Sequence, residues 1–188
     1  GETKVEIPVS NANSGTVAVL VHPDGTEEIL KNSLPTENGI QLTVNGGATV
    51  KIIDNSKPFA DTQNHWAKDE VSFVAARELF NGVGGNRFDV SGSMTRGMVN
   101  TVLARLAGVD TEGGAKWYDK GTEWARANGI SDGTNPTAPV TREQLAAMLY
   151  RFAGAPAVSG ALSFNDANAV SEYARSALLW ATQNGILN

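Results

Sequence analysis

The sequence predicts an α+β protein, with a small antiparallel β domain at residues 1–57 followed by an all-α domain at residues 58–188. Apolar and polar residues alternate in the first part, which is typical of half-buried strands, whereas beyond Lys57-Pro58 the apolar residues recur at helical spacing. A period of about 50 residues within the helical part indicates stacked supersecondary units. The repeat is marked by pairs of aromatic residues seven positions apart, namely Trp66 with Phe73, Trp117 with Trp124, and Tyr173 with Trp180.

The composition fits a globular protein and excludes several classes of function. The chain of 188 residues is 41% hydrophobic and 19% charged, and we find no apolar run long enough to span a membrane and no visible signal peptide. It has no cysteine, which excludes disulfides, thiol catalysis and thiolate metal sites. The net charge of -5 argues against non-specific nucleic-acid binding, which needs a basic surface.

Residues 1–57 predict about five short strands. Period-2 alternation runs through residues 5–9, 17–21, 40–44 and 48–52. The segment Asn45-Gly46-Gly47 lies between the last two of these runs and predicts a β-hairpin that joins them. A core of this size is marginal, so we expect a small antiparallel sheet or half-sandwich that packs on its neighbour.

The helical part predicts three repeats, at about residues 58–109, 110–156 and 157–188, the last of them incomplete. The first helix of each is expected near residues 66–80, 117–130 and 173–187, with Gly129 and Gly185 as the glycines that follow the helix ends. These three apolar helices are expected to form a central bundle in a pseudo-threefold arrangement. The second helices would lie outside it.

The second helices are expected to begin at Thr95 and Thr141, because threonine is a good N-cap residue. Thr141 with Gln144 fits a capping box, whereas Met98 at the corresponding position does not. An arginine follows each threonine, at Arg96 and Arg142. A cation there is unfavourable by a few tenths to about 1 kcal/mol, because it lies at the positive end of the helix dipole.

The two Thr-Arg pairs are therefore candidate anion receptors. A helix N-terminus with free N–H groups, combined with a guanidinium group, can bind a carboxylate or a phosphate. The alternative is that each arginine forms a surface ion pair with a neighbouring Asp or Glu, which contributes little.

Most of the repeated aromatic residues are expected to pack in the core. Trp66 and Trp117 stand at the starts of the predicted helices, so they are the better candidates for stacking on a ligand. Gly82 and Gly133 are candidates for close approach of the backbone to a ligand, although plain turn glycines explain them equally well.

Catalysis and metal binding find little support. The only histidines are His22 and His65, and no nucleophile and base can be paired from motif evidence. Residues 132–143 have the length of a calcium loop, but Thr137 stands where that loop needs glycine. We therefore expect no metal, no cofactor and no enzymatic activity.

These motifs resemble the S-layer homology domain, and the resemblance covers residues 58–188. The pattern departs from that family at Gly97-Met98, where the family has Ala-Glu, and the third unit ends at Asn188 before its own Thr-Arg helix. The matching segments are Phe59-x-Asp61, Trp66-Ala67, Thr95-Arg96, Asn128-Gly129-Ile130, Thr141-Arg142-Glu143, Phe164-x-Asp166 and Asn184-Gly185-Ile186.

The resemblance implies a module that anchors an exported bacterial protein to the cell wall without catalysis. Its partner would be an acidic, pyruvate-bearing secondary cell wall polymer, and its location would be extracellular. The implied glycan-binding residues are Arg96 and Arg142, with Thr95, Thr141, Trp66, Trp117, Gly82 and Gly133 around them. Two alternatives stay open: a helical-repeat module that binds proteins, and an accessory fragment of a larger cell-surface enzyme.

Overall fold

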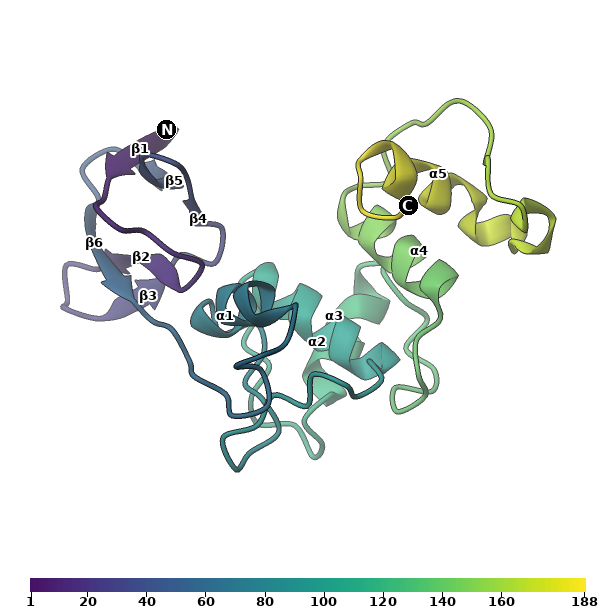
Figure 1. The fold of residues 1–188 in the computed structure, drawn as a ribbon, viewed down its shortest axis with the longest axis horizontal. Coiled ribbons are helices and arrows are strands. Elements are labelled where there is room, and N and C mark those ends of the chain that lie inside the picture. The colour runs from purple at the N-terminus through teal and green to yellow at the C-terminus, as the bar shows by residue number, and fades with distance from the viewer. The chain divides into compact units, whose positions relative to one another are not determined.

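The computed structural model describes residues 1–188, which form two compact units, residues 1–92 and 93–188 (Figure 1). The mixed α+β composition is as predicted. The predicted domain boundary after residue 57 falls inside the first unit, because helix α1 packs on the strands. In order, the elements are β1 (Glu2–Pro8), β2 (Thr16–Val21), β3 (Glu27–Ile29), β4 (Leu34–Pro35), β5 (Gly39–Asn45), β6 (Thr49–Asp54), α1 (Lys68–Ala76), α2 (Arg96–Leu106), α3 (Asp119–Ala127), α4 (Arg142–Phe152), η1 (Ala167–Ala169), η2 (Glu172–Ala174) and α5 (Arg175–Gln183).

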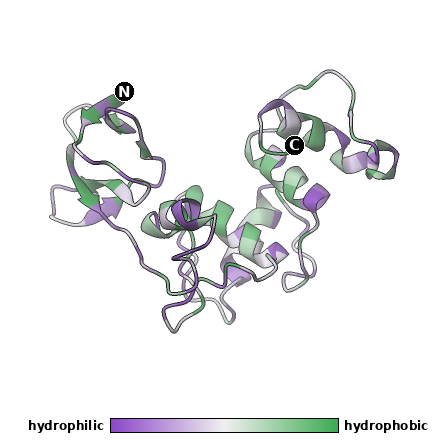
Figure 2. Ribbon diagram, viewed as in Figure 1, coloured by the Kyte–Doolittle hydropathy of each residue, from purple (hydrophilic) through white to green (hydrophobic).

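The strands of the first unit form two antiparallel sheets of three strands each, in the orders β1-β5-β4 and β3-β2-β6. Ile40 and Leu42 of β5 are buried with Ala18 of β2, and apolar residues of β1 and β6 pack around them. The two sheets therefore enclose one core between them. Hydrophobic residues are concentrated in the strands and helices, whereas many connections are hydrophilic (Figure 2).

The predicted hairpin at residues 45–47 is wrong. A turn does form, with the amide of Ala48 donating to the carbonyl of Asn45 over 3.2 Å, but β5 pairs with β1 and β4 whereas β6 pairs with β2. A two-residue hairpin would have placed Leu42 and Val44 on the face opposite Val50 and Ile52, because side chains alternate along a strand. Pairing in separate sheets lets all four apolar residues face one core.

Strand β2 is buried on both faces, and its second face is covered by α1. Val17 and Val19 pack with Ala76 at the end of that helix. A strand covered on both faces reads as a nearly continuous apolar run, as residues 17–21 do.

Arg77 follows α1 directly and is completely buried. Its five N–H groups donate to four backbone carbonyls, those of Ser14, Thr16, Ser33 and Phe73, over 2.7–3.1 Å. The guanidinium carbon also lies 3.7 Å from the centre of the Phe73 ring. Burial lowers the pKa of Arg77 to about 10, so the guanidinium stays charged at neutral pH. This residue fastens the end of α1 to the β-strands.

In the second unit, the helices pack as α2 with α3 and α4 with α5. The α2–α3 contact is close, because a Cβ at Gly121 would lie 2.7 Å from the Cα of Thr101. The α4–α5 contact is lined by the small residues Ala146, Ala147, Ala177 and Ala181. The second helix of one repeat thus packs on the first helix of the next.

The predicted central bundle of first helices is not found in this unit. Ala125 of α3 belongs to one apolar cluster and Ala177 of α5 to another. Helix α4 contributes to both clusters, with Met148 on one side and Ala146 on the other. Because α4 is apolar on both of these faces, it separates α3 from α5 rather than lying outside them.

The predicted helix ends are confirmed, although the first helices are shorter than expected, at nine residues each. Gly129 and Gly185 adopt positive φ just beyond their helices, and Ile130 and Ile186 close the turns by donating to Ala125 and Ala181. The same position in the first repeat holds Glu78, at a φ of 57°. None of the helices is both long enough and apolar enough to cross a membrane.

The predicted N-caps are also confirmed, with one correction. The Thr95 hydroxyl accepts from the amide of Met98, and the Thr141 hydroxyl accepts from that of Gln144, both over 3.2 Å. The expectation that Met98 could not complete a capping box is wrong, because its sulfur accepts from the Thr95 amide over 3.4 Å. A thioether is a weak acceptor, which is why the residue type did not suggest this role.

Candidate binding site

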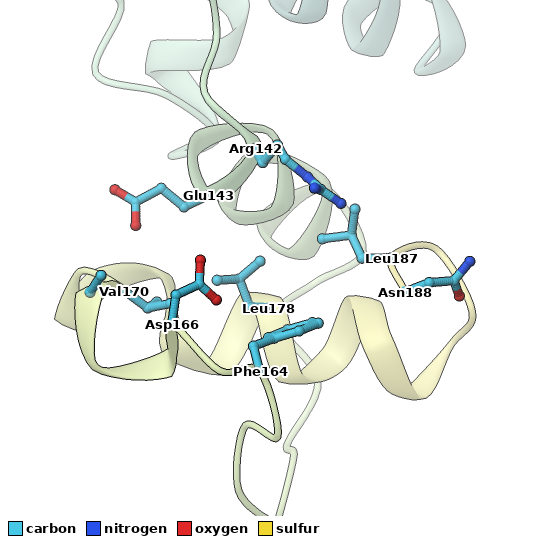
Figure 3. Close-up of a pocket in the computed structure, with 9 residues that line it drawn as sticks. Arg142, Glu143, Phe164, Asp166, Val170, Leu178, Leu187 and Asn188 are labelled. Atoms are coloured by element: carbon cyan, nitrogen blue, oxygen red, sulfur yellow. The ribbon is translucent and has the colours of Figure 1, made fainter.

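A groove of about 230 Å³ lies in the second unit, between the start of α4 and the segment that runs from residue 164 to α5 (Figure 3). We call it the Arg142 groove. Arg142 extends toward Leu187 on one side, and the Asp166 side chain rises from the opposite wall. The groove is lined by Arg142, Glu143, Phe164, Asp166, Ala169, Val170, Leu178, Leu187 and Asn188.

The start of α4 combines free backbone N–H groups with an arginine that has no partner. Thr141 and Gln144 satisfy each other's backbone amides, but the amides of Arg142 and Glu143 donate to no acceptor. The exposed Arg142 guanidinium makes neither a hydrogen bond nor an ion pair. Free N–H groups, the positive end of a helix dipole and a free guanidinium together favour an anion here.

Glu143 holds the opposite wall in place. Its carboxylate accepts from the amide of Ser171 over 3.0 Å, from the Ser171 hydroxyl over 2.8 Å and from the Tyr173 hydroxyl over 3.3 Å. The hydrogen bonds from Ser171 lower the pKa of the Glu143 carboxyl. Burial, together with the charge of Glu143, raises the pKa of the Tyr173 phenol. Tyr173 is thereby fixed beside the first turn of α4.

The rest of the groove combines apolar side chains with one free acceptor. Phe164 and Leu178 form part of its floor (Figure 3). The Asp166 carboxylate accepts no hydrogen bond from the protein, so its oxygens are available to hydroxyl groups. The groove therefore combines a cation, a hydrogen-bond acceptor and an apolar floor, which suits a polar ligand that carries an anionic group.

The start of α2 has the same Thr-Arg pair but different surroundings. The amides of Arg96 and Gly97 donate to the carbonyls of Ala138 and Pro136, over 3.0 and 2.7 Å. The Arg96 guanidinium is paired with Asp132, with 2.6 Å between Nη2 and Oδ1, and the Arg96 side chain is only 15% exposed. This agrees with the alternative interpretation of an arginine held by a neighbouring carboxylate.

The first aromatic residue of each pair is exposed and the second is packed. Trp66, Trp117 and Tyr173 are 85%, 53% and 51% exposed. Trp66 and Trp117 precede α1 and α3, and Tyr173 lies in the 3-10 turn η2 that leads into α5. Trp124 and Trp180 are half-buried, with rings 6.2 Å from Phe152 and 5.7 Å from Tyr150. The helical spacing predicts a packed Tyr173, whereas its side chain is exposed. Its alignment with Trp66 and Trp117 is the signal that would have found it.

The two candidate glycines both have positive φ. A Cβ at Gly82 would lie 2.7 Å from the Arg87 carbonyl oxygen and 2.8 Å from the Phe59 ring, so the close approach there is to the protein's own chain. A Cβ at Gly133 would meet only ordinary contacts, and its amide donates to the Ser131 hydroxyl over 3.1 Å.

Asp61 of the Phe-x-Asp motif organises a loop of the first unit. Its carboxylate accepts from the amides of Phe88, Asp89 and Val90 over 2.8–3.3 Å. These bonds, that of Phe88 foremost, lower the pKa of Asp61. The motif is therefore structural here, whereas Asp166 at the matching position in the third repeat faces the Arg142 groove.

Helix pairs that repeat along the chain, each beginning with a capped Thr-Arg turn, define this protein as a helical-repeat module with an N-terminal β-sandwich. Residues 58–97 match the family model of the S-layer homology domain. This segment is therefore similar to the S-layer homology domain, and it contains the first Thr-Arg pair of the chain.

Three relatives extend the similarity beyond that segment. The chain is 27% identical over 176 residues to the exoglucanase XynX of Acetivibrio thermocellus, covering 84% of this chain and 16% of that protein. It is 27% identical over 150 residues to an amylopullulanase of Thermoanaerobacterium thermosulfurigenes, covering 70% of this chain and 8% of that protein. It is 28% identical over 100 residues to an endo-1,4-beta-xylanase A of Thermoanaerobacterium saccharolyticum, covering 46% of this chain and 9% of that protein. The chain thus spans a small part of each relative's length.

Proposed function

We propose that this chain holds an exported bacterial protein on the cell wall, without a covalent bond, by binding an acidic, pyruvate-bearing secondary cell wall polymer. The family match at residues 58–97 supports the anchoring role. The observation that carries the choice of ligand is the unpaired guanidinium of Arg142, beside two free amides at the start of α4.

In this proposal, the carboxylate of the pyruvate group binds Arg142 and the amides of the first turn. A hydrogen bond to a charged partner contributes about 1.5–3 kcal/mol, so this contact supplies much of the affinity of one sugar unit. Asp166 accepts from sugar hydroxyls. Tyr173 offers an exposed ring at the edge of the groove.

The other predicted residues have supporting roles. Thr95 and Thr141 fix the helix starts, and Trp66 and Trp117 offer exposed rings for stacking on further sugar units. Arg96 contributes from within its ion pair with Asp132. Gly82 and Gly133 shape the turns rather than contact the glycan.

We assign no catalytic role to this chain and place it outside the cell. The names of its relatives describe glycan-degrading enzymes, and the chain matches only a small part of each. An anchor that keeps a larger protein at the cell surface accounts for that distribution.

Arg142→Ala tests the proposal. Binding to purified cell wall should fall by about tenfold or more, while the melting temperature changes little, because the side chain is exposed and makes no bond. Arg126→Ala removes an exposed arginine elsewhere in the same unit and should leave binding unchanged. Each variant is measured on walls with and without the secondary polymer. Equal binding to both kinds of wall, or normal wall binding by folded Arg142→Ala, would contradict the proposal.

A further inference from the structure

The two Thr-Arg helix starts differ in what their arginines contact. Nη2 of Arg96 lies 2.6 Å from a carboxylate oxygen of Asp132 and 3.4 Å from the hydroxyl of Ser131. The guanidinium of Arg142 contacts no such partner. Two arginines that the repeat makes equivalent therefore stand in different states of charge compensation.

The repeat itself accounts for this difference. Residues 129–132 read Gly-Ile-Ser-Asp, and residues 185–188 read Gly-Ile-Leu-Asn. Leu187 and Asn188 thus replace the two residues that hold Arg96, and both line the groove beside Arg142. Neither side chain carries a charge that could compensate a guanidinium.

The Asp132 carboxylate lies on the solvent side of the Arg96 guanidinium. The Asp132 side chain is 64% exposed and the Arg96 side chain 15%, so the carboxylate covers the arginine from the solvent side. The amide and the hydroxyl of Thr134 both donate to the same Asp132 oxygen, each over 2.9 Å. These bonds, with that of Arg96, lower the pKa of Asp132 and keep it ionised at neutral pH.

We infer that Asp132 is a specificity-determining residue, which closes the Arg96 position to acidic ligands and leaves Arg142 as the receptor for the acidic group. An incoming carboxylate at Arg96 would have to displace one that is already held by three hydrogen bonds. The Arg96–Asp132 pair offers both donors and acceptors, so it suits the hydroxyl groups of a neutral sugar. This inference rests on the proposed function, because it divides the proposed glycan between two chemically different positions.

The experiment titrates the full chain with a monosaccharide that bears a pyruvate ketal, and with the same monosaccharide without the ketal. Wild type should bind the acidic sugar at one position, and Arg142→Ala should bind it about tenfold more weakly or worse. Asp132→Asn in the Arg142→Ala background should recover about tenfold of that loss. Asp132→Asn alone should raise the stoichiometry from about one to about two.

Asp110→Asn is the matched control, because Asp110 also accepts an amide two residues ahead, that of Glu112, and its loss changes the net charge equally. Asp110→Asn should not recover binding. Asp132→Ser repeats the test with a second neutral side chain, in case the asparagine variant fails to fold. Folded Asp132 variants that recover no binding would overturn this inference alone. Failure of wild type to bind the acidic sugar would overturn the proposed function as well.

Discussion

The residue that follows the first helix of each repeat makes the same hydrogen bond to its own helix in all three repeats. Only in the first repeat does it also bond to a distant part of the chain. Arg77, Asn128 and Asn184 each donate to the carbonyl four residues earlier, over 3.1, 2.9 and 2.8 Å. Both asparagines are exposed, and their side chains make no other hydrogen bond. Arg77 is buried and makes four more hydrogen bonds, all to the β-sandwich. One substitution at an equivalent position thus decides whether a helix end serves only its own helix or joins it to a sheet.

Arg77→Asn is the strongest way to break this comparison, because it gives the first repeat the residue of the other two. The carbonyls of Ser14, Thr16 and Ser33 would lose their partner. An unsatisfied buried group costs about 1–3 kcal/mol, so the free energy of unfolding should fall by about 3 kcal/mol or more. Urea denaturation of the full chain, with amide exchange in β2, measures the loss.

Asn128→Ala is the control for that variant. It removes one exposed bond and should cost only about 0.5–1.5 kcal/mol. Equal losses for the two variants would mean that the contacts of Arg77 with the β-sandwich contribute no stability.

Asp61 and Asp166 extend the comparison to the Phe-x-Asp motif. The pKa of Asp61 is lowered by three backbone amides, so its contribution to stability is present above its unfolded-state pKa of about 4 and is lost as the pH falls through the lower folded-state value. The amides of residues 88–90 should therefore exchange faster under acid conditions.

Asp61→Asn should make those amides exchange fast at neutral pH also and abolish most of the pH dependence. The Asp166 carboxylate accepts no hydrogen bond from the protein, so Asp166→Asn should leave amide exchange in the third repeat unchanged. Slow exchange at residues 88–90 in Asp61→Asn would show that the loop is held by other contacts.

Glu78→Gly should give the smallest effect, and in the opposite direction. Glu78 has a φ of 57° where the other repeats have Gly129 and Gly185, and a side chain there costs about 1–2 kcal/mol. The extra freedom of glycine in the unfolded chain offsets part of this gain, so we expect a net stabilisation of about 0.5–1 kcal/mol by thermal unfolding. Glu78→Ala retains the strained backbone and should give no gain.

Local features of the fold were predictable from sequence, and pairings across it were less so. The caps at Thr95 and Thr141 and the turns at Gly129 and Gly185 depend on neighbouring residues, so the pattern identified them. The pairing of β5 and β6 in separate sheets required knowing which face of each strand meets the core. The turn residues alone do not specify this.

In the candidate site too, the local motif was predictable and the contacts between distant residues were not. The Thr-Arg motif identified Arg96 and Arg142, but not that Asp132 compensates only the first of them. Aligning residues 129–132 with residues 185–188 shows that the aspartate is present in only one of the two segments. The alignment becomes informative only once the contact between Arg96 and residue 132 is known. Arg77 offered no signal, because its partners are backbone carbonyls, which any sequence supplies.

For a chain proposed to hold a protein against a wall, the Arg77 contacts also determine how tension travels. A pull on β1 reaches α1 through the covalent segment 55–67 and through non-covalent contacts with the strands, among which the Arg77 guanidinium makes the most hydrogen bonds. The guanidinium donates to carbonyls within residues 14–16 and to that of residue 33. Because these bonds start from one rigid group, they bear the load in parallel and are expected to break together rather than one after another. The segment 55–67 is then relieved of force until these bonds break.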